Sequence, residues 1–577
     1  MSLLIKMASA SNEVVVDKCK IVIIGAGMAG LSAANHLLKN GITDFKILEA
    51  RGRVGGRIVS IETGCQRVEL GANWIHGVLG NPMYELAMAN GLIDIVHIPK
   101  PHRVVASTEQ GKQIPFHLLQ EIYEAYVCFL RRCEEYFLSN YLPPAGVNSV
   151  GQHINLEVAL FLQHAMEGDA EKRHLSELIF DCLLKRETCI TGCHSMDEID
   201  LLELGSYSEL QGGNIVLPSG YSSILSPVTR DIPADRIVCR CAVAAVRWRA
   251  DAFSSHLASP GGDSGIELLA NGDVGNESDD SDETVKEEPL AGGGEEPPGD
   301  VSEPRKVKGD PSTSNSLGPP ANVVVECEDG RRFLADHVIC TVPLGVLKEK
   351  AATLFSPPLP RYKLDSIDRL LFGTVDKIIL EYDRPFLNPD ISEVMLLWEK
   401  HDYDEDSLDD DLSKCWFRKI YSFSKLSDTL LLGWISGKEA EYMEKLSLEE
   451  VGDKCTEILR MFLNDPFVPK PKRCICTSWF SQPFTRGSYT AMAVGACQED
   501  IENIAQPVYS SPTHRKPTLL FAGEHTHSSF YSTVHGAYLT GRTAAQMLVG
   551  PDSPEETVME CEGTSDLSSW IQGISLD

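Results

Sequence analysis

The hydrophobic pattern at the start of the chain predicts a buried strand, a helix and a second strand. Residues 21–24 are four β-branched apolar residues, and residues 31–39 carry apolar side chains at helical spacing. A second apolar run, residues 45–48, follows a short polar segment. This order is typical of the βαβ unit of a parallel sheet.

The turn between the first strand and the helix has the sequence GAGMAG and occupies residues 25–30. In such a turn Gly25 permits a sharp bend, Gly27 lets the backbone approach a pyrophosphate, and Gly30 lets the helix pack closely on the strand. Glu49 ends the second strand, where an acidic residue accepts a hydrogen bond from a ribose hydroxyl. The pattern predicts a dinucleotide site that also includes Met28 and Ala29.

The remaining pattern predicts a mixed α/β protein. Residues 117–138 and 157–184 carry apolar side chains at helical spacing, whereas residues 243–248 and 323–327 resemble strands. Residues 254–320 are rich in Gly, Pro, Ser, Asp and Glu, which predicts a disordered insertion. Because strand-like segments lie on both sides of it, we expect these two flanks to pair.

We predict two domains, each assembled from separate segments, and an acidic tail at residues 551–577. The nucleotide-binding domain takes residues 19–90, 219–345 and 471–550. The substrate domain takes residues 91–218 and 346–470.

The net charge of −31 argues against nucleic acid or an anionic membrane as partner. The chain has no signal-peptide core, no apolar run long enough to span a bilayer and no peroxisomal S-K-L ending, so we expect a cytoplasmic protein.

The 17 cysteines follow no zinc or disulfide spacing, which predicts reduced thiols and no metal site. Two C-x-C pairs, at residues 239–241 and 474–476, are expected to pack in the core because residues two apart on a strand share a face.

The segment after Glu49 narrows the choice of dinucleotide. Residues 49–57 read EARGRVGGR, which places the glycine pair 55–56 between two arginines, as a second approach to a pyrophosphate requires. Together with the preceding GxGxxG, it resembles the signature of the flavin-containing amine oxidases. The resemblance implies non-covalently bound FAD, with Ala50, Arg51, Arg53, Gly56 and Arg57 beside it.

Further segments extend this resemblance along the chain. Residues 71–77 (GANWIHG), 341–347 (TVPLGVL), 486–489 (RGSY) and 523–537 are similar, in order and spacing, to the polyamine oxidase branch of the family, which comprises spermine oxidases and N1-acetylpolyamine oxidases. The additional cofactor residues that the resemblance implies are Gly71, Ala72, Asn73, Trp74, Val243, Trp479, Gly523, Glu524, Thr533 and Val534.

The resemblance also implies roles for residues near the reacting amine. Lys377, in a strongly apolar strand pattern, matches a lysine that holds a water at the flavin N5 atom, and it is the expected catalytic residue. His76 matches a residue of the polyamine tunnel. Tyr489 and Thr533 form two walls beside the flavin, where an aromatic face can contact an amine.

A polycationic substrate predicts carboxylates in its tunnel, and Glu209 and Glu399 are the candidates. The chain departs from its relatives at Ser206, which replaces an acid, and at Asn214, which falls near a position that is acidic in some members. The loss of an acid favours an acetylated or otherwise altered substrate, so the polyamine itself stays open.

These observations predict an α/β fold with a discontinuous Rossmann-like FAD-binding domain and a mixed-sheet substrate domain with helices. We expect a monomer that oxidises a secondary amine of spermine or an N1-acetylated polyamine, with O2 as acceptor, to an aminoaldehyde, a shorter polyamine and H2O2. The alternatives are a histone lysine demethylase of the same superfamily, a monoamine oxidase and a non-enzymatic flavin-binding scaffold.

Overall fold

The computed structural model describes residues 16–93, 103–249, 322–399, 411–511 and 516–549, apart from residue 65 and residues 166–167. The predicted disordered insertion at residues 254–320 and the predicted acidic tail at residues 551–577 lie outside the described residues.

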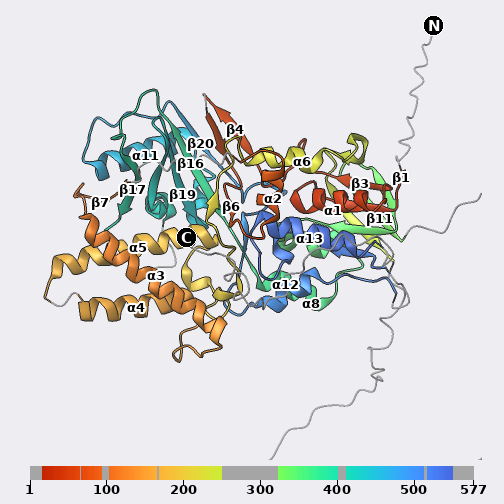
Figure 1. Ribbon diagram of the computed structural model, residues 1–577, viewed down its shortest axis with the longest axis horizontal. Helices are drawn as coiled ribbons and strands as arrows, with labels where there is room; N and C mark the ends of the chain where they lie inside the picture. The colour runs from red at the N-terminus through yellow and green to blue at the C-terminus, as the bar shows by residue number, and fades with distance from the viewer. Residues whose placement is uncertain are drawn as a thin grey trace, which may run out of the picture. The chain divides into compact units, whose positions relative to one another are not determined.

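A five-stranded parallel sheet carries the predicted βαβ unit (Figure 1). Its strand order is β22 (Leu519–Phe521), β13 (His337–Cys340), β2 (Ile21–Ile24), β3 (Phe45–Leu48) and β9 (Ile237–Val238). Helix α1 (Met28–Lys39) packs against β2, β3 and helix α13 (Val534–Gln546). The predicted strands match β2 and β3 residue for residue, and the helix begins three residues earlier than predicted.

The carboxyl end of β2 is the place where this sheet forms a binding crevice. From β2 the chain runs through α1 to β3 on one side, while β13, from far along the chain, pairs with β2 on the other side. Ligands of open α/β sheets bind at such a switch point. The Gly25–Gly27 turn lies there.

A second, six-stranded sheet has the order β20 (Arg473–Cys476), β16 (Val375–Glu381), β19 (Leu430–Ser436), β18 (Ser422–Ser427), β17 (Ile391–Leu397) and β7 (Arg103–Thr108). Its neighbours are antiparallel except for the parallel pair β17–β7, so the sheet is mixed. Helix α5 (Ala170–Thr191) packs on β17 and β19, beside α3 (Phe116–Ser139) and α4 (Val150–Ala165). The predicted fold class is confirmed.

The strands that border the insertion pair as predicted. Strand β10 (Val243–Trp248) is antiparallel to β11 (Val323–Cys327), and Trp248 lies opposite Val323. Both belong to a third sheet with β1 (Val16–Lys18), β12 (Arg332–Ala335) and β14 (Phe355–Ser356).

The helical spacing at residues 157–184 extends over two helices. Residues 157–184 do not form one helix but belong to two, α4 and α5. The break has a local cause: Gly168 adopts a left-handed conformation, and the side chain of Asp169 accepts a hydrogen bond from the backbone of Lys172, which caps α5. A cap and a glycine therefore outweigh the continuous apolar spacing.

The shorter elements connect these layers. They are β4 (Ser60–Thr63), β5 (Gln66–Glu69), β6 (Ile75–His76), α2 (Pro82–Ala89), β8 (Asn214–Ile215), α6 (Leu225–Thr229), α7 (Leu344–Leu354), α8 (Arg361–Arg369), β15 (Leu371–Gly373), α9 (Leu412–Cys415), α10 (Gly437–Met443), α11 (Leu448–Leu463), β21 (Tyr489–Ala491) and α12 (Gln498–Ala505). The predicted domain boundaries stay a prediction.

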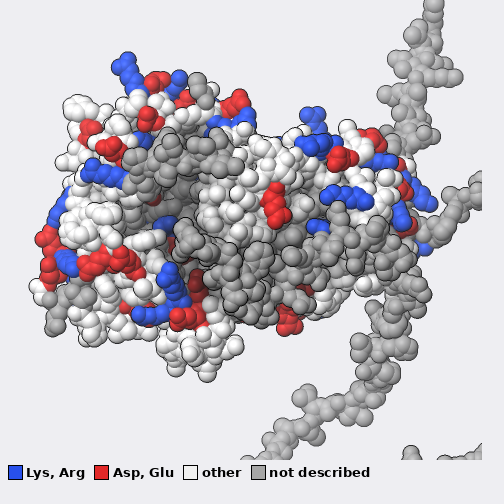
Figure 2. Space-filling view, in the orientation of Figure 1, with Lys and Arg blue, Asp and Glu red and all other residues white. Residues whose placement is uncertain are grey.

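On the face shown in Figure 2, the described residues carry both signs of charge. Figure 2 shows basic and acidic side chains interspersed over this face, with no broad area of one sign among the residues that it colours. Within the described parts of the chain, no helix is both long and apolar enough to cross a membrane.

Candidate active site and cofactor cavity

A cavity of about 1230 Å³ begins at the carboxyl end of β2 and is bordered by both large sheets. Its volume exceeds the usual range for sites of drug-sized ligands, about 300–1,000 Å³. Of the residues predicted to hold the cofactor, those on its wall are Gly25, Gly27, Met28, Ala29, Glu49, Ala50, Arg51, Gly56, Arg57, Gly71, Ala72, Asn73, Trp74, Val243, Trp479, Gly523, Glu524, Thr533 and Val534. The predicted residues that reach it for catalysis or substrate are Lys377, His76, Tyr489, Glu209 and Asn214.

The glycines at the start of α1 form an open cradle. A Cβ atom at Gly27 would meet no atom within 4 Å, whereas one at Gly30 would lie 2.0 Å from the carbonyl oxygen of Gly25. Gly56 approaches the same place, since its Cβ would lie 3.4 Å from the Cα of Gly27. Gly30 therefore lets α1 pack against the turn at a position away from the cavity wall. Gly27 leaves space for an anion at the N-terminus of α1, which fits a pyrophosphate.

The substitution Gly27→Ala should separate folding from cofactor binding. Gly27 has φ −77° and ψ −176°, which alanine adopts freely, so we expect an unchanged melting temperature for the apoprotein. The added methyl group occupies the pyrophosphate space, and FAD affinity should fall about tenfold or more. Titration of apoprotein with FAD measures this. Gly30→Ala is the contrasting variant and should lower the melting temperature instead.

Glu49 is held by the backbone at the end of β3. Its Oε2 accepts a hydrogen bond from the backbone N–H of Ala26, and its Oε1 accepts one from the backbone N–H of Arg51, both at 2.8 Å. Each carboxylate oxygen has a second lone pair, so a ribose hydroxyl can still donate to Glu49. Arg53 does not reach the wall, because its guanidinium donates to the carbonyls of Val54 and Gly56 and supports the glycine loop.

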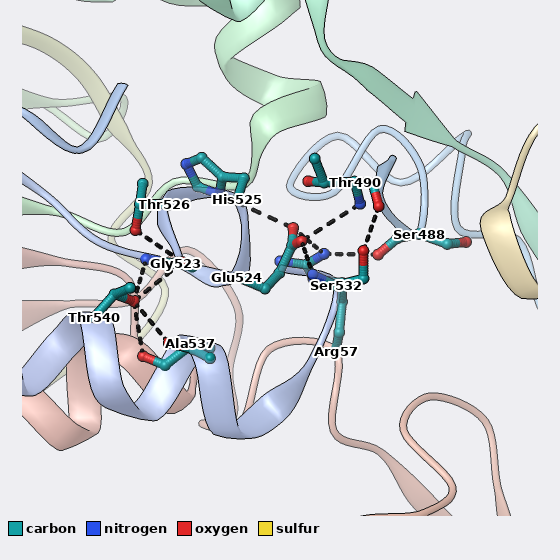
Figure 3. Close-up of polar contacts among 11 residues, drawn as sticks. Arg57, Ser488, Thr490, Gly523, Glu524, His525, Thr526, Ser532, Ala537 and Thr540 are labelled. Carbon is teal, nitrogen blue, oxygen red and sulfur yellow. Dashed lines mark hydrogen bonds and ion pairs between the residues drawn. The ribbon is translucent and has the colours of Figure 1, made fainter. Parts of the chain in front are cut away.

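Glu524 accepts hydrogen bonds from three other residues of the cavity wall (Figure 3). Its Oε1 accepts from Arg57 Nη1 at 3.0 Å, and its Oε2 accepts from the backbone N–H of Ser532 at 3.0 Å and of Thr490 at 3.4 Å. Burial alone would raise the pKa of Glu524, but Arg57 and, to a smaller extent, His525 hold it below its ordinary value. The hydrogen bonds of Arg57 to Ser488 and Glu524 both use Nη1, so its guanidinium has further donors for an anionic ligand.

Lys377 lies on β16 at the cavity wall and is only 3 % exposed. Its Nζ donates to the carbonyl oxygens of Glu69 at 2.8 Å and Gly71 at 2.7 Å, and to Oδ1 of Asn73 at 2.6 Å. Burial lowers the pKa of Lys377 to about 7. An ammonium has three donors, and all three are used here. A water held by Lys377 must therefore replace one of these oxygens or bond to the neutral amine.

A second buried lysine lies outside the cavity. Lys363, on α8, donates to the backbone carbonyls of Asn503, Ile504 and Gln506 at the end of α12. Burial lowers its pKa to about 7 as well. Burial and three hydrogen bonds therefore do not by themselves define a catalytic lysine; position on the cavity wall distinguishes Lys377.

The loop that carries Trp479 is held by two carboxyl groups that the sequence analysis missed. Asp376 Oδ1 accepts from the hydroxyl of Thr477 at 2.7 Å and from the N–H of Trp479 at 3.2 Å. Glu444 accepts from the next two backbone N–H groups, each at 2.8 Å. Burial and the neighbouring Glu444 raise the pKa of Asp376 well above its ordinary value. The indole of Trp479 donates to the carbonyl of Leu70 and is fixed against the wall.

The substrate end of the cavity has aromatic and polar walls. His76 and Asn214 lie opposite each other in the β6–β8 pair, and their side chains hydrogen-bond at 2.9 Å between Nδ1 and Oδ1. Trp74 stacks on Trp434 with ring centroids 6.0 Å apart. Tyr489 donates its hydroxyl to the carbonyl of Cys189 on α5, so its ring is fixed at the wall.

Besides Glu49, Glu328 and Glu524, three further glutamates line the same cavity: Glu134 on α3, Glu187 on α5 and Glu209. Burial raises the pKa of Glu187 to about 7, opposed by Arg186 and reinforced by Glu134. Burial, then Glu209, raises the pKa of Glu134. The sequence analysis predicted only Glu209, because helical periodicity alone does not show which polar side chains meet across helices.

Two other predicted positions lie off the wall. The hydroxyl of Ser206 is buried and donates to the carbonyl of Glu203, with Tyr531 Oη at 3.3 Å. Glu399 forms an ion pair with His174 at 2.9 Å. Neither residue is brought to the cavity, so the prediction that they contact the substrate has no support from the geometry of the wall.

Comparison with known proteins agrees with this geometry. The chain matches the model of the flavin containing amine oxidoreductase family over residues 28–264 and 311–549. It is 32% identical over 553 residues to the peroxisomal N(1)-acetyl-spermine/spermidine oxidase of Homo sapiens, which covers 93% of this chain and 96% of that protein. It is 25% identical over 606 residues to probable polyamine oxidase 5 of Arabidopsis thaliana, which covers 92% and 98%.

The fold also resembles that of a solved oxidase. A double mutant of putrescine oxidase superposes with a TM-score of 0.61 at 17% identity, covering 93% of this chain and 100% of that one. The family match and the similarity to the human oxidase define an FAD-dependent oxidoreductase. The chain belongs to the flavin-containing amine oxidoreductases; its cofactor is FAD, and it is an amine oxidoreductase.

Proposed function

We propose that the protein is a polyamine oxidase that acts on a secondary amine of spermine or of an N1-acetylated polyamine. The observation that carries the proposal is the distribution of charge in the cavity. Three carboxyl groups, those of Glu134, Glu187 and Glu209, share one cavity with the buried Lys377 and the fixed ring of Tyr489. This arrangement suits an elongated cation whose charged end is separated from its reacting amine.

The residues of this chain would have separate roles. The glutamates bind the distal ammonium groups of the substrate, and Trp74 and Tyr489 confine its methylene chain and reacting nitrogen. The apolar wall favours the neutral form of that nitrogen. When bound, FAD would supply the two-electron oxidation of the amine and the reduction of dioxygen. Lys377 holds or exchanges a proton near this position.

A direct assay tests the proposal. Purified holoprotein is given spermine, spermidine, N1-acetylspermine or a methyl-lysine histone peptide, and the released peroxide is measured. Turnover of free or acetylated polyamines supports the proposal, and their ratio assigns the preferred form. Turnover of the histone peptide alone would replace it with the demethylase alternative. Retention of FAD without turnover of any amine would favour the scaffold.

Glu187→Gln should weaken substrate binding in a pH-dependent way. Because the pKa of Glu187 is raised to about 7, its carboxylate forms as the pH rises through 7 and then attracts the ammonium. At pH 8 the KM for the polyamine should rise about tenfold or more in the variant, since a charge-assisted hydrogen bond is lost. Below pH 6 the two proteins should converge. Measuring KM from below pH 6 up to pH 9 tests both the rise at pH 8 and the convergence in acid.

The matched variant is Glu177→Gln, which changes a glutamate that lies on the same helix and pairs with Arg173 away from the cavity. An equal rise in KM for both variants would contradict a specific role for Glu187. The expected monomer and cytoplasmic location stay predictions.

A further inference from the structure

Two cysteines from different segments meet where β10 begins and β11 ends. Cys241 precedes β10 and Cys327 ends β11, and their Sγ atoms lie 3.3 Å apart. Both side chains are buried in the same apolar cluster. The expectation that Cys241 would share a strand face with Cys239 is wrong, because the intervening Arg240 has φ +53° and turns the chain.

The neighbourhood of this pair favours thiolate chemistry. The hydrogen bond between the two thiols lowers the pKa of Cys241; burial opposes this effect, and the guanidinium of Arg331 adds to it. Arg331 is fixed in place, because its Nη2 donates to the carbonyl of Arg240 at 2.9 Å and its Nε to Asp329 at 2.7 Å. A thiol with a nearby cation and an adjacent second thiol is the usual arrangement of an oxidation-sensitive pair.

The pair is also attached to the cofactor site. Cys241 forms part of the cavity wall, beside Val243. Its backbone N–H donates to the carbonyl of Glu49 at 2.9 Å, and that of Arg240 donates to the carbonyl of Arg51 at 2.9 Å. A change in the position of Cys241 therefore acts on the segment that carries the predicted ribose contact.

We propose that Cys241 and Cys327 are a modification site that hydrogen peroxide, the product of the oxidase reaction, converts to a disulfide. The Cys241 thiolate attacks one peroxide oxygen, the O–O bond breaks, and hydroxide leaves, which forms a sulfenic acid. The thiol of Cys327 then attacks this sulfur and releases water. Two thiols give up two electrons and two protons, and one peroxide becomes two waters.

The cross-link has a measurable consequence for stability. It joins residues 86 positions apart, so it removes conformational freedom from the unfolded chain. The oxidised holoprotein should therefore melt at a higher temperature than the reduced one, and dithiothreitol should reverse the difference. The rate of FAD release should differ between the two forms because Cys241 is bonded to the Glu49 segment.

The test uses reduced holoprotein treated with added hydrogen peroxide, then alkylated and mapped without reduction by mass spectrometry. We expect a peptide pair linked through Cys241 and Cys327. In Cys327→Ser, both this linked pair and the oxidation-dependent rise in melting temperature should be absent. Cys241→Ser is the second variant, should Cys327→Ser not fold. Because the peroxide is added, this test is independent of whether polyamines are the substrate.

The C-x-C pair Cys474 and Cys476, with Sγ atoms 3.8 Å apart on β20, is the internal control for general oxidation. The proposal is overturned if Cys241 and Cys327 are recovered alkylated, or only as sulfinic and sulfonic acids, at peroxide doses that oxidise this control pair. A second arm supplies an amine substrate with and without catalase. The link should form only without catalase.

Discussion

The variant Lys377→Met should slow amine oxidation by about 100-fold or more, the lower range for the loss of a positioned proton donor or acceptor. The substitution removes the only charge on this part of β16 that faces the cavity and leaves the oxygens of Glu69, Gly71 and Asn73 without their donor. Stopped-flow absorbance measures flavin reduction and reoxidation separately and shows which half-reaction uses the lysine.

Lys363→Met is the matched control, because this lysine has the same burial and number of hydrogen bonds outside the cavity. It should lower the melting temperature while the remaining folded holoprotein keeps normal rates. If Lys377→Met retained both flavin rates, Lys377 would be a structural lysine of the same kind as Lys363.

Glu524→Gln should weaken FAD binding and destabilise the protein by about 2–3 kcal/mol. This is below the cost of breaking a fully buried pair, because the Arg57 side chain is 24 % exposed. The amide cannot neutralise Arg57, although it keeps the size of Glu524. Flavin content after gel filtration and thermal melting at pH 7 measure the two effects.

The same variant should change how the stability of the protein depends on pH in acid. The folded-state pKa of Glu524 lies below its ordinary value of 4.5, so its contribution is fully present above pH 4.5 and is lost as the pH falls through the folded pKa. The difference between the two proteins should therefore shrink below pH 4.5. A constant difference down to pH 3 would show that the charge of Glu524 is not what stabilises this wall.

The cofactor cradle was predictable from the sequence because its geometry is local. Gly25, Gly27 and Gly30 act within one turn, and Glu49 follows at the end of the next strand, so spacing alone places them together. The same reasoning failed at Arg53, since its guanidinium has backbone carbonyls of its own loop within reach. Residue type and spacing do not show whether an arginine side chain points to the cavity or to the carbonyls of its own loop.

The substrate wall was less predictable because it is assembled from distant segments. Glu134 and Glu187 come from two helices, and no periodicity indicates that both face the cavity with Glu209. Ser206 lies three positions before Glu209, yet its hydroxyl turns to Glu203 and Tyr531. Asp376 next to Lys377 was overlooked as well, although a carboxyl group inside an apolar strand signals a buried partner.

The pairing of Trp248 with Val323 has a consequence for the evolution and engineering of this chain. Facing residues of antiparallel strands lie about 5 Å apart, so the intervening segment leaves and re-enters the fold at nearly the same point. For a flexible connection between two such points, each doubling of length costs only about 0.6 kcal/mol in loop closure. This hairpin can therefore accept a shorter linker, a longer one or a fused reporter domain while the geometry of the catalytic cavity is preserved.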